Sequence, residues 1–178
     1  MSARALLIAA ALALLPGAAG AQAIEWRLDH RNQPSILAGV LYEQLIVAAA
    51  DDSDEEGSRP GAVADLAFGL PLNDEGGELF LGLRAGRGDH ENRLVAPHLF
   101  YRVYGGAEAW KTFFDAGLLL RIEPLWAVAA RIGIGVQYDF HENWGAWLGA
   151  GPSIGYGDAV QVGIDAGLGV QFRFGTAG

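Results

Sequence analysis

The chain contains no cysteine among its 178 residues. This absence excludes disulfide bonds, cysteine-based metal sites and the acylated amino terminus of a lipoprotein. Beyond the first residues there is also no apolar run of the ~20 residues that a transmembrane helix needs. Basic residues are scarce, 12 against 21 acidic ones, and the net charge of −9 argues against nucleic acid as a partner. No nucleotide or metal-binding motif is evident either, so we expect no cofactor.

The first 23 residues have the pattern of a secretory signal peptide. Arg4 supplies the positive charge, residues 5–15 form an apolar stretch, and Ala21-Gln22-Ala23 offers a small-x-small cleavage site. The alternative interpretation is an uncleaved membrane anchor. The apolar stretch is shorter than the ~20 residues that a membrane-spanning helix needs. The mature protein is therefore expected to begin at Ile24 and to be exported.

After a polar lead-in of residues 24–34, the chain divides into eight segments of similar length separated by turn sequences. Each has about 9–15 residues, which suits a tilted strand that crosses a membrane better than the shorter strands of soluble sheets. The segments are residues 35–49, 61–72, 78–86, 94–104, 110–122, 125–140, 144–156 and 160–174, and residues 175–178 form a short tail.

Apolar residues alternate with glycine, glutamine and charged residues in these segments, as in VQVGIDAGLGVQFRF near the end of the chain. A period of two places the two sets on opposite faces of a sheet. In a soluble, lipocalin-like barrel the apolar face points inward, and in a membrane barrel it meets lipid. Here the polar face is rich in glycine and has hardly any threonine. Glycine weakens a solvated strand but makes room inside a narrow barrel, so we predict an all-β, eight-stranded, antiparallel, up-and-down transmembrane β-barrel for residues 35–174.

The polar faces carry five acidic and six basic residues, close to the balance that buried charges require. This predicted lumen charge network comprises Glu43, Asp65, Arg84, Arg102, Lys111, Asp115, Arg121, Arg131, Asp139, Asp165 and Arg173. The first segment leaves two alternatives open. Glu43 and Gln44 are adjacent, so either one of them faces outward or a bulge separates them.

Aromatic residues gather near the ends of the segments, as the interface girdles of membrane barrels require, although ordinary packing at strand ends is an alternative. The predicted girdle comprises Trp110, Trp126, Tyr138, Phe140 and Trp144; Phe113, Phe172 and Phe174 belong to the same group of strand-end aromatics.

Together, the export signal, the eight alternating segments and a last segment ending in VQFRF resemble the small outer-membrane β-barrels of Gram-negative bacteria, the OmpA/OmpX-type group. VQYDFHENWGAW is similar to the strand, periplasmic turn and strand common in that group. The resemblance implies a monomer in the bacterial outer membrane, surrounded by outer-membrane lipid. It also implies that Phe172 and Phe174 serve as the signal for the barrel-assembly machinery.

A non-enzymatic structural or surface-interaction role is the function we expect. A lipid-modifying enzyme, the first alternative, would need serine, histidine and an acid together on the lipid face. A soluble ligand-binding barrel is the second alternative. A pore would need an open lumen, whereas eight strands leave an interior that side chains just fill. If the first strand starts in the periplasm, the long acidic connection of residues 51–60 lies outside the cell.

Overall fold

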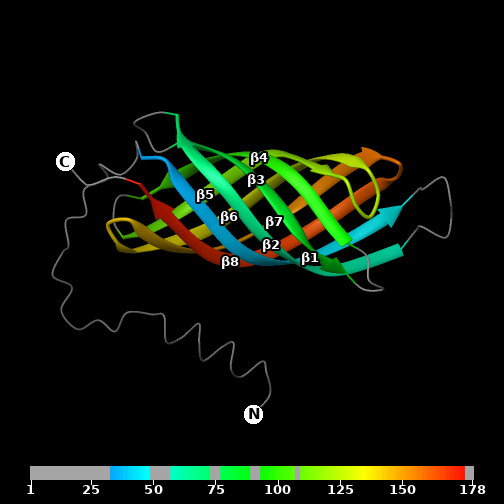
Figure 1. Ribbon diagram of the computed structural model, residues 1–178, viewed down its shortest axis with the longest axis horizontal. Helices are drawn as coiled ribbons and strands as arrows, with labels where there is room; N and C mark the ends of the chain where they lie inside the picture. The colour runs from blue at the N-terminus through cyan, green and yellow to red at the C-terminus, as the bar shows by residue number, and fades with distance from the viewer. Residues whose placement is uncertain (1–32, 49–56, 73–76, 89–92, 107–108, 175–178) are drawn as a thin grey trace, which may run out of the picture.

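The computed structural model describes residues 33–48, 57–72, 77–88, 93–106 and 109–174. Within these ranges eight strands form one closed antiparallel barrel in which each strand pairs with the next and β8 pairs with β1 (Figure 1). The strands are β1 (Ser35–Ala48), β2 (Gly57–Pro71), β3 (Gly77–Gly88), β4 (Arg93–Gly105), β5 (Trp110–Arg121), β6 (Ala127–His141), β7 (Trp144–Gly157) and β8 (Val160–Arg173). The predicted fold class is confirmed. The predicted signal peptide and the tail lie outside the described residues.

Closure of the barrel depends on the pairing of the first strand with the last. Ser35 pairs with Arg173 at one end and Ala48 with Val160 at the other, so the ladder runs the full length of β1. The end that holds Ser35 and Arg173 is called the terminal end here, and the end reached by Ala48 and Val160 is called the opposite end. Because every strand has two neighbours, the barrel has no free sheet edge. In the described part of the chain, no helix is long and apolar enough to span a membrane.

Side chains on the two faces of the barrel wall differ sharply in exposure. Outward-facing Leu81 and Ile134 are 64% and 67% exposed, whereas inward-facing Arg84 and Arg131 are 3% and 6% exposed. A soluble barrel would have the opposite arrangement, because charged groups prefer water and apolar groups avoid it. The arrangement of the faces therefore contradicts the soluble ligand-binding alternative.

Two local expectations are decided by the register of β1 and β2. Glu43 pairs with Gly61 and Gln44 with Pro60 in an uninterrupted ladder, so no bulge separates the two polar residues. Glu43 faces inward and is buried, while Gln44 faces outward. Strand β2 also begins earlier than expected, at Gly57, and includes Ser58 to Pro60, which the sequence pattern assigned to the preceding connection.

The glycine-rich inner face accommodates large aromatic side chains. A Cβ atom on Gly135 would overlap the ring of Phe113, and one on Gly39 would overlap the ring of Trp147. Phe113 and Trp147 belong to a buried apolar cluster, with exposures of 5% and 6%. Glycine thus supplies the space that these rings occupy, as expected for a narrow barrel. The grouping of Phe113 with aromatic residues of the outer girdle was wrong, because its position on β5 is in phase with the inward-facing residues.

Candidate functional site

The candidate site is the charged interior of the barrel. Ion pairs in the described residues join six acidic and six basic side chains, together with His98. The acids are Glu43, Asp65, Glu78, Asp115, Asp139 and Asp165, and the bases are Arg84, Arg102, Lys111, Arg121, Arg131 and Arg173. The structure therefore brings together all eleven residues of the predicted lumen network.

Glu78 is the member of this network that sequence reasoning missed. It is 2% exposed, and its carboxylate lies 3.7 Å from Nε of Arg173. Its position is in phase with Phe80 and Arg84 on β3, so the period of two could have revealed it. With Glu78 included, the carboxylates and the Lys and Arg side chains of this ion-pair network are balanced, six against six.

Arg131, on β6, is the centre of the network. Its Nη1 donates to Asp115 at 2.5 Å, while Nε and Nη2 donate to the two oxygens of Asp165 at 2.7 and 2.6 Å. Arg84, on β3, donates to Asp165 at 3.1 Å and to Asp65 at 3.3 Å. Asp165, 1% exposed, therefore accepts hydrogen bonds from two guanidinium groups that reach it from different strands. These contacts link β2, β3, β5, β6 and β8 across the lumen.

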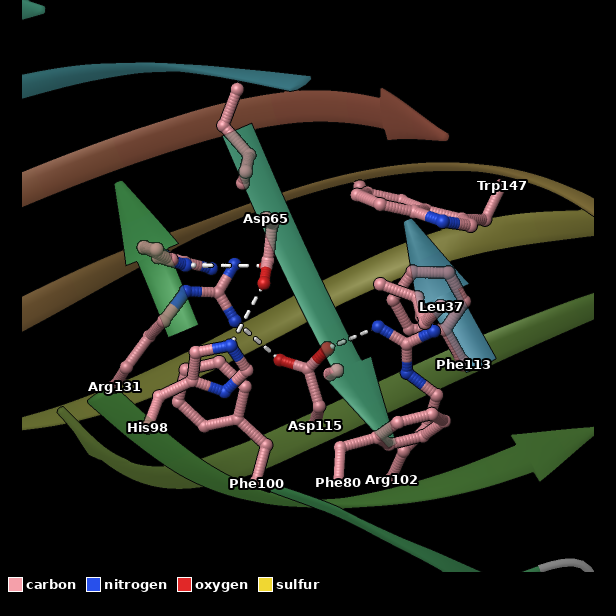
Figure 2. A pocket seen from close by; sticks show the side chains of 14 residues that line it. Leu37, Asp65, Phe80, His98, Phe100, Arg102, Phe113, Asp115, Arg131 and Trp147 are labelled. Atoms are coloured by element: carbon pink, nitrogen blue, oxygen red, sulfur yellow. Dashed lines mark hydrogen bonds and ion pairs between the residues drawn. The ribbon is translucent and has the colours of Figure 1, made fainter. Parts of the chain in front are cut away.

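Aromatic rings adjoin this central group on the side toward the terminal end. Arg102 donates to Asp115 at 2.9 Å, and its guanidinium carbon lies 3.8 Å from the centre of the Phe113 ring. Nε2 of His98 lies 2.8 Å from Asp65. Figure 2 shows Arg131 and Arg102 approaching Asp115 from opposite sides, with the aromatic rings around Arg102. Cation–π contact lowers the cost of burying the guanidinium away from water.

Two smaller groups continue the network toward both ends of the barrel. Toward the opposite end, Arg121 donates to Glu43 at 2.6 Å and to Ser153 at 2.9 Å. Toward the terminal end, Asp139 forms ion pairs with Lys111 and, at 3.4 Å, with Arg173. Four neutral polar side chains also belong to the group near the terminal end: Ser35, Tyr104, Gln137 and Gln171.

The space left between these side chains is small. A cavity of about 20 Å³ lies between the central charged group and the rings of Phe80, Phe100, Phe113 and Trp147. A volume of this size holds about one water molecule. Charged groups enclosed in this way are tolerated only when they are paired, because an uncompensated buried charge costs several kcal/mol. The arrangement can therefore stabilise one closed state of the lumen and leaves little room there for a ligand.

The aromatic residues of the predicted girdle lie at both ends of the outer surface. At the terminal end, Trp110 packs on Tyr138 and Trp144 packs on Phe172, each with 4.7 Å between ring centres. Phe140, 51% exposed, also lies at this end, and the rings of Phe172 and Phe174 are 5.1 Å apart. Trp126 lies at the opposite end, where Tyr156 joins it as an exposed aromatic residue that the sequence analysis left out.

Fold and interior together define a class of protein. A closed eight-stranded barrel with an apolar outer wall and a polar, ion-paired interior has the architecture of a small transmembrane β-barrel. No protein-family model and no curated protein matches the sequence.

Solved structures make the fold more specific. The crystal structure of Neisserial surface protein A superimposes with a TM-score of 0.65 at 14% identity, covering 79% of this chain and 97% of that one. The N-terminal β-barrel domain of Pseudomonas aeruginosa OprF is similar at 20% identity, with a TM-score of 0.46, 80% of this chain and 98% of that one. Pseudomonas aeruginosa OprG matches at 12% identity, with a TM-score of 0.47, 84% of this chain and 100% of that one. Because their TM-scores are below 0.5, the OprF and OprG structures add no support for the fold beyond that from Neisserial surface protein A.

The chain has the fold of the small eight-stranded outer-membrane β-barrels of Gram-negative bacteria. At 14% identity the similarity extends to the fold alone.

Proposed function

We propose that this protein is a monomeric outer-membrane β-barrel with a closed lumen and a structural or surface-interaction role. The bridge from Asp115 through Arg131 to Asp165 carries this proposal, because it crosses the interior and is almost completely buried. The apolar outer wall supports insertion into a bilayer, and the exported location follows from the predicted signal peptide. Outer-membrane lipid and, during biogenesis, the barrel-assembly machinery are the partners we infer, with no cofactor and no nucleic acid.

A pore is a poorer fit to the interior than a closed barrel. Water and ions could pass the centre only if the pairs of Arg131 with Asp115 and Asp165 separated. Removing one partner of a buried ion pair costs about 3–5 kcal/mol, and an open state would have to offset a comparable cost.

A lipid-modifying enzyme also finds little support in the described residues. Nucleophile and base must lie within hydrogen-bonding reach of each other. Ser58 is exposed on β2 near the opposite end, whereas His141 is exposed near the terminal end. His98 and Ser153 face the interior and are buried. The non-enzymatic role is therefore the better proposal.

Membrane fractionation combined with surface proteolysis tests this proposal. We expect the full-length protein in the outer-membrane fraction, and we expect protease added to intact cells to cut only connections at the opposite end of the barrel. Purified protein in planar bilayers should show no stable conductance, while an open porin measured alongside provides the positive control. Recovery in the soluble fraction would contradict membrane insertion, and steady channel currents would contradict the closed lumen.

A further inference from the structure

The outer wall is almost free of charge, with one local exception. Among the described strand residues, Arg87 on β3 and Arg93 on β4 are the outward-facing residues with a formal charge. Both are exposed, and they are direct cross-strand partners in the β3–β4 ladder. The ion pairs found in the described part of the chain include neither of them. Two cations thus lie side by side on a wall where the other described outward-facing strand residues carry no formal charge.

This pair is unfavourable without an anion. Residues directly opposite in an antiparallel ladder have Cβ atoms about 4.5–5.5 Å apart, and like charges at that separation destabilise the strand pair. In the described part of the chain, the strand cations that form ion pairs all face the interior. A group with two or more acidic oxygens placed between Arg87 and Arg93 would convert the repulsion into charge-assisted hydrogen bonds.

The level of the pair along the barrel indicates where such an anion lies. The outward residues of β3 that precede Arg87 are Leu79, Leu81, Leu83 and Ala85. From Leu79 to Arg87 the strand rises by about 20 Å along the axis, given ~3.3 Å per residue and a tilt of ~40°. An apolar band in a membrane barrel is about 25 Å tall. Arg87 is also the last outward-facing residue of β3, so it lies near the border of the apolar band, at the level of lipid headgroups.

Neighbouring side chains leave space beside the two arginines. The same cross-strand row runs from Tyr42 through Ala62 to Arg87 and Arg93. Ala62 is small, so lipid can approach the wall beside Arg87. At the edge of the row, the Tyr42 hydroxyl donates to Gln44 at 3.1 Å and provides neutral hydrogen-bonding groups. These four residues of the row, Tyr42, Ala62, Arg87 and Arg93, are called the arginine patch.

We propose that the arginine patch binds a phosphate group on the headgroup of an outer-leaflet lipid. Guanidinium groups bind phosphate oxygens in a bidentate way, and two adjacent ones can enclose a single phosphate. Both residues are exposed on the outer face of the wall, where lipid headgroups can reach their guanidinium groups. Residues 49–56, which connect β1 to β2 at this end, carry five acids and would repel a soluble polyanion. The inference rests on the proposed function, since it requires membrane insertion with this end outward.

Reconstitution of the mature chain into vesicles of defined composition tests the inference. The vesicles contain phosphatidylcholine with either phosphatidic acid or diacylglycerol, which differ only in the phosphate. The temperature at which the folded, heat-modifiable band is lost should be higher with phosphatidic acid. In the double variant R87Q/R93Q this difference should disappear, and binding of phosphatidic acid measured by native mass spectrometry should weaken by at least about tenfold.

Matched variants distinguish a phosphate site from a general effect of charge. R59Q removes a charge of the same kind near the same end of the barrel, but from the inward face of β2, and it should keep the full response to phosphatidic acid. R87K/R93K should keep part of it, because lysine provides charge without bidentate geometry.

Three outcomes would overturn the inference in distinguishable ways. An equal response of the parent and R87Q/R93Q would refute the phosphate site alone. An equally strong response of the parent to dissolved inorganic phosphate would point to a soluble anion instead. Failure of the parent to fold into either kind of vesicle would refute membrane insertion and the lipid site together.

Discussion

Single residues in this barrel show how charge is kept inside a narrow wall. Asp165 is buried, yet it is surrounded by N–H donors from Arg84 and Arg131, so its charge is compensated where water cannot reach it. Gly133 shares in this arrangement, because a Cβ atom there would collide with Asp115 and with the guanidinium of Arg131. Glycine at this position therefore provides the space that the buried ion pair of Arg131 and Asp115 occupies.

The substitution Arg131→Leu should lower the free energy of unfolding by about 3–5 kcal/mol, because two buried carboxylates lose a shared partner. Urea unfolding in detergent micelles or bilayers, followed by tryptophan fluorescence, measures this change. The neighbouring substitution Ile132→Leu is the control and should have little effect, since Ile132 faces outward and is 51% exposed. Ile132→Arg should impair membrane insertion by placing charge in lipid, at a cost of about 2–4 kcal/mol. A neutral Arg131→Leu together with a tolerated Ile132→Arg would mean that the faces are reversed.

Gly135→Val should destabilise the barrel by overpacking, by at least about 1–3 kcal/mol, because the new side chain would collide with the ring of Phe113 and the backbone oxygen of Leu148. Gly105→Ala is the control: it lies exposed at the end of β4, where a Cβ atom would meet only the Thr112 hydroxyl at 3.0 Å. Thermal loss of the heat-modifiable band compares the two variants. Similar melting temperatures for Gly135→Val and Gly105→Ala would contradict the prediction, because the interior would then have accommodated the larger side chain by rearranging.

At the scale of strands, β8 closes the barrel, because it pairs with β1 along the full length of that strand. Its pairing continues past Arg173, since the amide of Phe174 donates to the carbonyl of Pro34 at 2.9 Å. Outside the barrel, Trp144, Phe172 and Phe174 form a row of contacting rings. The strand thus ends in an ordered aromatic group at the terminal end, where the proposed assembly signal lies.

We predict that Phe174→Ala lowers the amount of folded protein in the outer membrane far more than deletion of residues 175–178. The reason is that the substitution removes a ring of the ordered group, whereas the deletion leaves it intact. Comparison of boiled and unboiled membrane samples on a gel gives the folded fraction. Equal folded yields for Phe174→Ala and the parent would leave the aromatic group with a packing role only.

At the scale of the molecule, charge is divided between the interior and the connections. The six acids and six bases of the ion-pair network cancel, so the net charge of −9 arises outside that network. Five of the acids lie in residues 49–56, between β1 and β2. Strand parity places this connection at the opposite end, together with those that follow β3, β5 and β7.

An epitope inserted at Glu55 should therefore be accessible to antibody on intact cells, whereas one inserted at Glu142 should become accessible only after the outer membrane is permeabilised. Glu142 lies between β6 and β7, at the terminal end. The physical reason is that outer-membrane barrels keep long connections outside and short turns in the periplasm. Labelling of the Glu142 epitope alone on intact cells would invert the topology, and with it the leaflet assigned to the arginine patch.

The sequence by itself determined the strands, their number and their two faces, because a period of two and turn residues are local properties of the chain. It also determined most of the interior charges. Glu78 was missed although the predicted segment 78–86 includes it, because its phase with Arg84 was not followed to the first residue of that segment. Phe113 was grouped with the outer aromatics because its position near a strand end was weighed above its phase.

Only the tertiary structure decided which residues meet across the lumen. Arg84 and Asp165 are separated by 81 positions and come together because closure of β1 on β8 sets the stagger of all eight strands. The same register placed Arg87 beside Arg93 and made Glu43 an inward residue without a bulge. A local pattern tells the face on which a side chain lies, but its height relative to other strands is a property of the closed barrel as a whole.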